Sequence, residues 1–335
     1  MNARMFVALG VAALLWPTLW LSRAPAQTPE STALQLEAKI PLGNVAGRID
    51  HMAVDLERQR LFIAELGNNS VGVVDLKDRK VLHRIGSLKE PQGVGYVRAI
   101  DTLYVSNAGD GSVRLYRGAD FTEAGRIDLG DDADNIRFDG KAGHVLIGYG
   151  NGALAAIDWT SRNKVADVAL KAHPESFQLD GSTGLIFVNV PRAREIAVID
   201  RAAGKQIADW PLNNDSTFPM ALDTDNRRVL VVSRRPAVLA VLSMQAGVPV
   251  ATVDTCGDAD DLFVDAKRHR AYVTCGEGFV DVFDAQGNAF GRLAHIPTIS
   301  GARTSLWVPE MDRLLVAARA SSGEPASVWV LRPSP

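Results

Sequence analysis

The sequence predicts an all-β fold, a seven-bladed β-propeller built from four-stranded antiparallel blades. Two observations predict it: a short motif recurs seven times, and each copy is followed by short runs rich in β-branched and aromatic residues. Between the copies there is no amphipathic helical pattern of useful length, which disfavours a βαβ fold. Four short strands in about 40 to 45 residues is the period of a propeller blade.

Each copy of the motif is an apolar stretch that, in most copies, begins with a polar residue and ends with aspartate. The copies occupy residues 50–55, 92–97, 134–139, 175–180, 218–223, 260–265 and 304–309. Their last residues are 41 to 44 positions apart, so the spacing is nearly constant. We therefore expect seven equivalent units, with the motif as the first strand of each.

The first unit illustrates the remaining strands, which we expect at residues 61–64, 71–74 and 80–85. The seventh unit has a third strand at 328–331 and no fourth. The segment 34–40 resembles the fourth strands of the other units. We therefore predict that this N-terminal strand completes the last blade and closes the ring, which leaves only short, protected edges.

Residues 1–26 have the features of a secretory signal peptide. Arg4 precedes an apolar run at 5–21, and Ala24-Pro25-Ala26 forms a small-residue cleavage site. An uncleaved membrane anchor is the alternative, but the run is short for a membrane span. We therefore predict that residues 27–335 form one propeller domain that is periplasmic or secreted and is not inserted in a membrane after cleavage.

The composition excludes some classes of protein. Of the 335 residues, 47% are hydrophobic and 22% are charged, as in ordinary globular proteins and unlike disordered chains. The formal net charge is −3, so the chain has no excess of the basic residues that binding to nucleic acid or to anionic membranes requires. We expect a monomer that binds no nucleic acid and whose partner is a protein or a small molecule.

The two cysteines, Cys256 and Cys275, are expected to form a disulfide. In an oxidising compartment, two thiols of one domain are more often paired than free. Neither belongs to a C-x-x-C or C-x-x-C-H motif, so the sequence gives no support for thioredoxin-like chemistry or haem attachment.

The second strands resemble the repeat of a known family. Tyr104-Val105-Ser106-Asn107 and Tyr272-Val273-Thr274-Cys275 are similar to the motif that names the YVTN-repeat family of bacterial exported seven-bladed β-propeller proteins. Val73-Val74-Asp75 looks like the end of the third strand of that repeat. The resemblance covers essentially the whole mature chain. It implies the propeller fold and, for function, a binding or scaffold role.

Function is expected where the innermost strands begin, at the mouth of the central channel. The first residues of the seven copies are Asp50, Gln92, Asp134, Glu175, Phe218, Asp260 and Thr304. Arg303 adjoins the last of these positions and is expected either to bind an anionic group or to balance the carboxylates. The predicted ligand-binding residues are Asp50, His51, Gln92, Asp134, Asn135, Glu175, Asp260, Asp261 and Arg303.

Four of these seven first residues are carboxylates: Asp50, Asp134, Glu175 and Asp260. Converging carboxylates repel one another unless protons, water and salt, or a bound cation relieve the repulsion. Oxygen ligands of this kind suit Ca²⁺ or Mg²⁺, so these four residues are candidate metal ligands. A water-filled channel that tolerates the carboxylates is the alternative, and no cofactor is certain from the sequence.

The same positions resemble the metal-ligand positions of the gluconolactonase and senescence-marker family, whose propeller has six blades. That resemblance implies an alternative function, a metal-assisted lactonase or esterase in which a metal-bound water attacks the substrate and His51 or His173 carries the proton. The sequence identifies no catalytic residue and favours a binding protein over an enzyme. A pure interaction scaffold is the third possibility.

Overall fold

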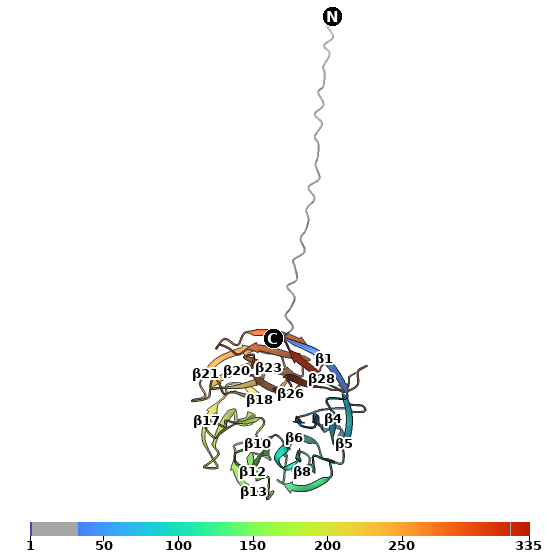
Figure 1. Cartoon of the computed structure of the whole chain (residues 1–335). Coiled ribbons are helices and arrows are strands. Elements are labelled where there is room, and N and C mark those ends of the chain that lie inside the picture. The colour runs from blue at the N-terminus through green and yellow to red at the C-terminus, as the bar shows by residue number, and fades with distance from the viewer. Residues whose placement is uncertain (2–32, 322) are drawn as a thin grey trace. The chain divides into compact units, whose positions relative to one another are not determined.

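The computed structural model describes Met1 and residues 33–321 and 323–335. In this part of the chain, 28 strands form seven four-stranded antiparallel sheets arranged in a ring (Figure 1), so the predicted seven-bladed propeller is confirmed. The predicted signal peptide falls, apart from Met1, outside the described residues. The start of the domain at residue 27 therefore stays a prediction.

In each of the first six blades, the four strands follow one another in the chain from the centre of the ring to its rim. Blades 1 to 3 comprise β2 (Met52–Asp55), β3 (Arg60–Glu65), β4 (Ser70–Asp75) and β5 (Lys80–Ile85); β6 (Pro91–Val97), β7 (Thr102–Asn107), β8 (Ser112–Arg117) and β9 (Glu123–Asp128); and β10 (Ile136–Asp139), β11 (His144–Tyr149), β12 (Ala153–Asp158) and β13 (Lys164–Ala169).

Blades 4 to 6 comprise β14 (Phe177–Leu179), β15 (Leu185–Val190), β16 (Glu195–Asp200) and β17 (Lys205–Pro211); β18 (Asp215–Asp223), β19 (Arg228–Arg235), β20 (Ala237–Ser243) and β21 (Pro249–Asp254); and β22 (Ala259–Asp265), β23 (Arg270–Cys275), β24 (Phe279–Asp284) and β25 (Arg292–Pro297). Blade 7 comprises β26 (Thr304–Val308), β27 (Arg313–Ala318), β28 (Ser327–Pro333) and β1 (Leu34–Pro41). Three short 3-10 turns, η1 (Leu66–Asn68), η2 (Arg98–Ile100) and η3 (Pro191–Ala193), connect strands, and no helix of the described residues is long and apolar enough to span a membrane.

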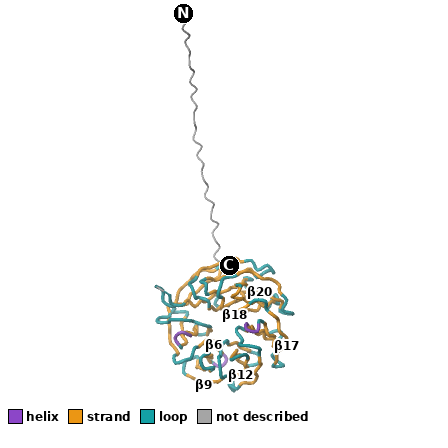
Figure 2. The backbone as a smooth tube through the Cα atoms, turned by 180° about the vertical axis from the view of Figure 1, so that it is seen from behind, coloured by secondary structure: helices purple, strands orange, loops and turns teal. Residues whose placement is uncertain are grey.

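The hydrophobic core lies between neighbouring blades. Seven apolar clusters each join two adjacent blades; one of them packs Phe62 and Val73 of blade 1 against Leu103 and Val105 of blade 2. The second strand of a blade is buried on both faces because a neighbouring blade covers each face, whereas the outer strand β5 is mostly exposed. Figure 2 shows the same ring from behind, with strands as its main elements. The near-constant spacing of the repeat therefore corresponds to one blade per copy, each packed against its two neighbours.

The aspartate that ends the motif closes the turn between the first and second strands. Asp55 Oδ1 accepts hydrogen bonds from the backbone N–H groups of Glu57 (3.1 Å) and Arg58 (3.2 Å), and Asp55 Oδ2 pairs with the Arg58 guanidinium (2.9 Å). The same side-chain-to-backbone bonds form at Asp139, Asp180 and Asp265. The recurring aspartate thus stabilises the turn at the far end of the inner strand from the channel mouth.

The predicted closure of the ring is confirmed. Strand β1 pairs antiparallel with β28, with Ile40 opposite Val328, and the Leu42 N–H donates to the Ala326 carbonyl (2.9 Å). Both Ile40 and Leu42 are fully buried, in the cluster that joins blades 7 and 1. The strand nearest the N-terminus therefore holds the ring shut by a backbone ladder and by apolar packing.

Removal of residues 1–42 is expected to abolish the single cooperative unfolding transition, because it exposes β28 and opens the interface between blades 7 and 1. A chain that begins at residue 27 is the matched control and should unfold in one transition. The smaller change Leu42→Ala should lower the free energy of unfolding by about 2–5 kcal/mol. Calorimetry of the three proteins tests the closure, and an unchanged transition in the truncated chain would contradict it.

Candidate functional site

The first residues of the repeats converge on a narrow polar cavity of about 30 Å³. Eight of the nine predicted ligand-binding residues line this cavity, namely Asp50, His51, Gln92, Asp134, Asn135, Glu175, Asp260 and Asp261. The ninth, Arg303, is not in the lining but pairs with Asp260 through its Nε (2.9 Å). We call this cavity the channel mouth.

Backbone hydrogen bonds direct these side chains. The Asp50 N–H donates to the carbonyl of Ala64 (2.7 Å), which belongs to the second strand of the same blade. The Glu175 N–H bonds in the same way to the Asn189 carbonyl (3.0 Å). Since the backbone of these residues is attached to the neighbouring strand, their side chains are left to face the channel.

In blade 7, the strand register shows that the residue equivalent to Asp260 of blade 6 lies one position earlier than expected from the sequence. Val308 stands where Asp265 stands in blade 6, because each pairs with the residue that begins its second strand. Counting back five residues from each gives Arg303 and Asp260. The expected ring residue Thr304 is therefore wrong by one position, and its hydroxyl donates to a backbone carbonyl instead (3.1 Å). In blade 7, Arg303 and not Thr304 therefore occupies the position equivalent to Asp260.

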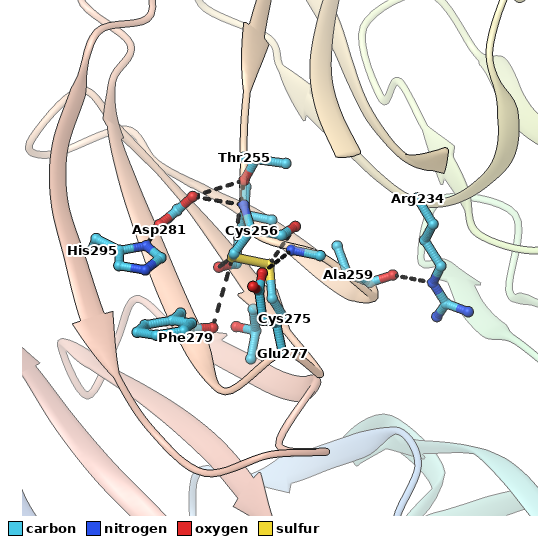
Figure 3. The surroundings of a disulfide bond; sticks show 12 residues. Arg234, Thr255, Cys256, Ala259, Cys275, Glu277, Phe279, Asp281 and His295 are labelled. Atoms are coloured by element: carbon cyan, nitrogen blue, oxygen red, sulfur yellow. Dashed lines mark hydrogen bonds and ion pairs between the residues drawn. A yellow bond between two sulfur atoms is a disulfide. The ribbon is translucent and has the colours of Figure 1, made fainter. Parts of the chain in front are cut away.

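Asp260 has its charge compensated by two arginines. Arg234 Nη2 lies 2.5 Å from Asp260 Oδ1, and Arg303 Nε lies 2.9 Å from Asp260 Oδ2. Both guanidinium groups also pair with Asp258, at 3.2 and 3.1 Å. Arg234 Nε is fixed further by the Ala259 carbonyl (2.9 Å; Figure 3). On this side of the mouth, the expected repulsion between carboxylates is relieved by the protein itself.

Asp50 is compensated more weakly. Its carboxylate is 2% exposed and pairs with Arg48 (2.7 Å), whose side chain is itself partly exposed. His51 Nε2 lies 3.7 Å from the other oxygen of Asp50. Asp261, the next carboxylate, accepts the N–H of Ser305 (2.7 Å).

Three residues on the opposite side of the mouth have no arginine partner among the described residues. Asp134 Oδ1 and Asn135 Oδ1 are buried and accept no hydrogen bond, although their residues are only 5% and 3% exposed. The nearest base is His173, whose Nε2 lies 3.7 Å from Asp134 Oδ2. Glu175 lines the same cavity, and no side-chain hydrogen bond or ion pair to it is seen within the described part of the chain. Arginines thus compensate the carboxylates on one side of the mouth, whereas on the other side, among the described residues, His173 is the only base within 4 Å of Asp134 and no base lies that close to Glu175.

Burial shifts the proton equilibria of this site. Loss of solvent, together with nearby carboxylates, raises the pKa of Asp50 to about 8 and that of Glu175 to about 8. Burial also raises the pKa of Asp261 to about 6. For His173, burial acts in the opposite direction, but the nearby carboxylates of Asp134 and Asp132 and the hydrogen bond with the Gly150 carbonyl raise its pKa to about 9. Near neutral pH the mouth therefore retains protons that the same groups lose in water.

The candidate metal ligands Asp50, Asp134, Glu175 and Asp260 differ in what they offer an ion. Asp260 is already engaged by two arginines, whereas Asp134 and Glu175 are not. Within residues 33–321 and 323–335, no three His, Cys, Asp or Glu side chains are grouped so that they could hold a metal ion. A Ca²⁺ or Mg²⁺ site and metal-assisted hydrolysis of a lactone or ester stay predictions of the sequence.

The predicted disulfide between Cys256 and Cys275 is present (Figure 3). It ties the loop that precedes β22 to the end of β23, beside the carboxylates Asp258 and Asp260. Asp281, which is fully buried, supports this loop by accepting the N–H of Cys256 (2.8 Å). The disulfide therefore braces the loop that positions the arginine-bound carboxylates.

Sequence reasoning missed two residues of the site. Arg48 precedes the first motif in the entry loop and is the partner of Asp50. Arg137 lies inside the third motif, on β10, and lines the cavity. A signal for Arg137 was present, since a charged residue within an otherwise apolar inner strand is unusual.

These features define the protein as a seven-bladed β-propeller with a polar channel mouth that is charge-compensated on one side. No family model and no curated protein matches the sequence, so the resemblance to the YVTN-repeat family stays a prediction.

Solved structures with the same fold include a chain of hydrazine synthase from Kuenenia stuttgartiensis, with a TM-score of 0.75 and 16% identity over 91% of this chain and 99% of that one. They also include a chain from a crystal structure of the mitotic checkpoint complex, with a TM-score of 0.76 and 12% identity over 99% of this chain and 100% of that one. Such low identities show the fold alone, so function must be argued from the site.

The protein without ligand is expected to become less stable as the pH rises from about 5 to about 9. Asp50 and Glu175 keep a proton in the folded state up to about pH 8, and His173 keeps one up to about pH 9. The unfolded chain releases these protons at lower pH. The folded state therefore binds more protons in this interval, and the free energy of unfolding falls as the pH rises.

Urea unfolding at pH 5.5, 7 and 9 measures this slope. Asp50 faces charged groups from several elements, namely Arg48, His51, Asp134, Asp260 and Arg303. The variant with both Asp50→Asn and Glu175→Gln leaves those groups in place and should flatten the slope. A wild-type protein that is equally or more stable at pH 9 would show that the raised pKa values are wrong.

Proposed function

We propose that this protein is an exported binding protein whose channel mouth holds a small, positively charged group against Asp134, Asn135 and Glu175. A propeller fold suggests a binding or scaffold role, and its channel mouth is a usual place for ligands. The disulfide is compatible with a protein that works outside the cytoplasm.

The observation that carries this proposal is the pair of buried oxygens without hydrogen bonds, Asp134 Oδ1 and Asn135 Oδ1. A buried acceptor without a donor costs free energy, and the cost is larger for a carboxylate than for an amide. A ligand that brings N–H donors or a positive charge removes this cost. Glu175 lines the same cavity without an arginine partner. Burial raises its pKa to about 8, so it becomes a second carboxylate by releasing its proton when a cation binds.

The size of the mouth limits what can enter it. A cavity of about 30 Å³ has room for an ion, an ammonium group or a few waters, and not for the body of a larger ligand. Two sources share the required chemistry: a cation such as Ca²⁺ or Mg²⁺, and the ammonium group of an amine or of a lysine on a partner protein. The experiment below separates them.

Calorimetric titration of the mature protein with CaCl₂, MgCl₂ and methylammonium chloride, at a constant ionic strength set with NaCl, tests the proposal. We expect one saturable site for at least one of these cations. Removal of the charge by Asp134→Asn should weaken that site by about tenfold or more, because a charge-assisted contact is lost.

Asp128→Asn is the matched control, because Asp128 is an exposed carboxylate at the end of outer strand β9 and should leave the affinity unchanged. A metal site responds to CaCl₂ or MgCl₂ alone, and an ammonium site to methylammonium alone. The proposal fails if no cation binds, or if Asp134→Asn and Asp128→Asn have the same effect.

A further inference from the structure

A second cavity adjoins the channel mouth, deeper in the ring. Its volume is about 350 Å³, and it shares His51, Arg137, Gln178, Asp261 and Phe263 with the mouth. Its other lining residues lie on the inner strands. The apolar part of its wall is formed by Met52, Val54, Tyr96, Phe138, Phe263 and Leu306. We call this cavity the inner chamber.

Arg137 brings a guanidinium group to the junction of the two cavities. Its Nη1 donates to the carbonyl of Ile136 (2.8 Å), and its guanidinium lies over the ring of Phe177, 5.8 Å from the ring centre. No Asp or Glu among the described residues lies within ion-pair distance of it. Burial lowers the pKa of Arg137, which shows that the positive charge is costly at this place.

Arg137 is half-buried, and a fully buried arginine of the same protein shows how such a group is usually satisfied. Arg228, whose side chain is 5% exposed, forms an ion pair with Asp223 and donates to the carbonyls of Ala285 (2.5 Å) and Gly287 (2.6 Å). Its charge and most of its donors are therefore satisfied. By contrast, the only hydrogen bond seen for the Arg137 guanidinium among the described residues is the one to the Ile136 carbonyl, and it forms no ion pair.

The carboxylates nearest to Arg137 are engaged by other groups. Asp261 Oδ2 accepts the N–H of Ser305 (2.7 Å), and Asp261 Oδ1 faces His51 at 4.0 Å. Asp134 Oδ2 faces His173 at 3.7 Å. Both carboxylates favour the charged form of Arg137 from a distance without contacting it. The planar donor fork of Arg137 therefore remains available to a group in the cavity.

We propose that the inner chamber binds a small organic carboxylate, which takes paired hydrogen bonds from Arg137 while its apolar body lies against the chamber wall. A guanidinium group matches a carboxylate in shape and charge. The chamber has the volume of a small-molecule site, and its aromatic and aliphatic wall suits an apolar body. A single negative charge is favoured over a phosphate dianion, because Asp261 and Asp134 lie nearby.

The test is calorimetric titration of the mature protein with acetate, hexanoate, benzoate and phenylacetate, with benzamide as an uncharged counterpart of benzoate. We expect at least one carboxylate with an apolar body to bind more tightly than acetate, and benzamide to bind about tenfold or more weakly than benzoate. Arg137→Met should weaken carboxylate binding by about tenfold or more, and Arg137→Lys by less. Arg126→Met, on outer strand β9, is the control and should have no effect.

The melting temperature separates binding from a structural role. Arg137→Met removes an unpaired charge, so the variant without ligand should melt at the same or a higher temperature than the wild type. If Arg137→Met melts at a lower temperature than the wild type, and the wild type binds none of the carboxylates, then Arg137 has a structural role and the proposal is wrong. Carboxylate binding that survives Arg137→Met would overturn it as well, because the ligand would then lie elsewhere.

This inference does not depend on the cation site at the mouth. Asp134→Asn should weaken cation binding by about tenfold or more with little effect on carboxylate binding, whereas Arg137→Met should weaken carboxylate binding and not cation binding. Either proposal can therefore fail while the other holds.

Discussion

Closure of the ring is the constraint on which the rest of the structure depends. Each blade is apolar on both faces and is stable only between two neighbours, so the last blade must meet the first. The pairing of β1 with β28 meets this requirement and draws the seven inner strands around one axis. The first residues of the repeat copies are therefore brought together around one small cavity. The site is thus a consequence of the fold's symmetry, and its chemistry depends on which residue each blade places there.

The residues at those positions do not balance one another evenly. Blades 5 and 7 and the entry loop of blade 1 supply Arg234, Arg303 and Arg48, which compensate Asp260 and Asp50. Blades 3 and 4 supply Asp134 and Glu175 without a matching arginine. A charge that is shielded from water and has no close partner is costly, and such groups are common at binding sites. Asp134, whose nearest base is His173 at 3.7 Å, and the half-buried Arg137, which forms no ion pair, are two such groups of opposite sign in one channel.

The sequence was sufficient for most of the fold. The repeat spacing predicted seven blades, segment 34–40 predicted the closing strand, and the cysteine pair predicted the disulfide; all three are confirmed. The position of eight mouth residues followed from the same repeat. The sequence placed blade 7 one residue off, because Val308 stands in place of the aspartate that marks this turn in five of the other blades. Arg303 was expected to balance the carboxylates, and it pairs with Asp260. The partners Arg48 and Arg234 were not predicted, because they come from the entry loop of blade 1 and from strand β19 of blade 5, which only the closed ring brings to the mouth.

A crystal structure of the mature protein, purified without chelators, would show what occupies the channel mouth. We expect electron density for a cation or an ammonium group within contact distance of Asp134 Oδ1 and Asn135 Oδ1, on the side of the mouth without arginines. Anomalous scattering would distinguish Ca²⁺ from a lighter group. Side chains turned so that Arg48 or Arg234 satisfies both oxygens, or water alone at that place, would contradict it.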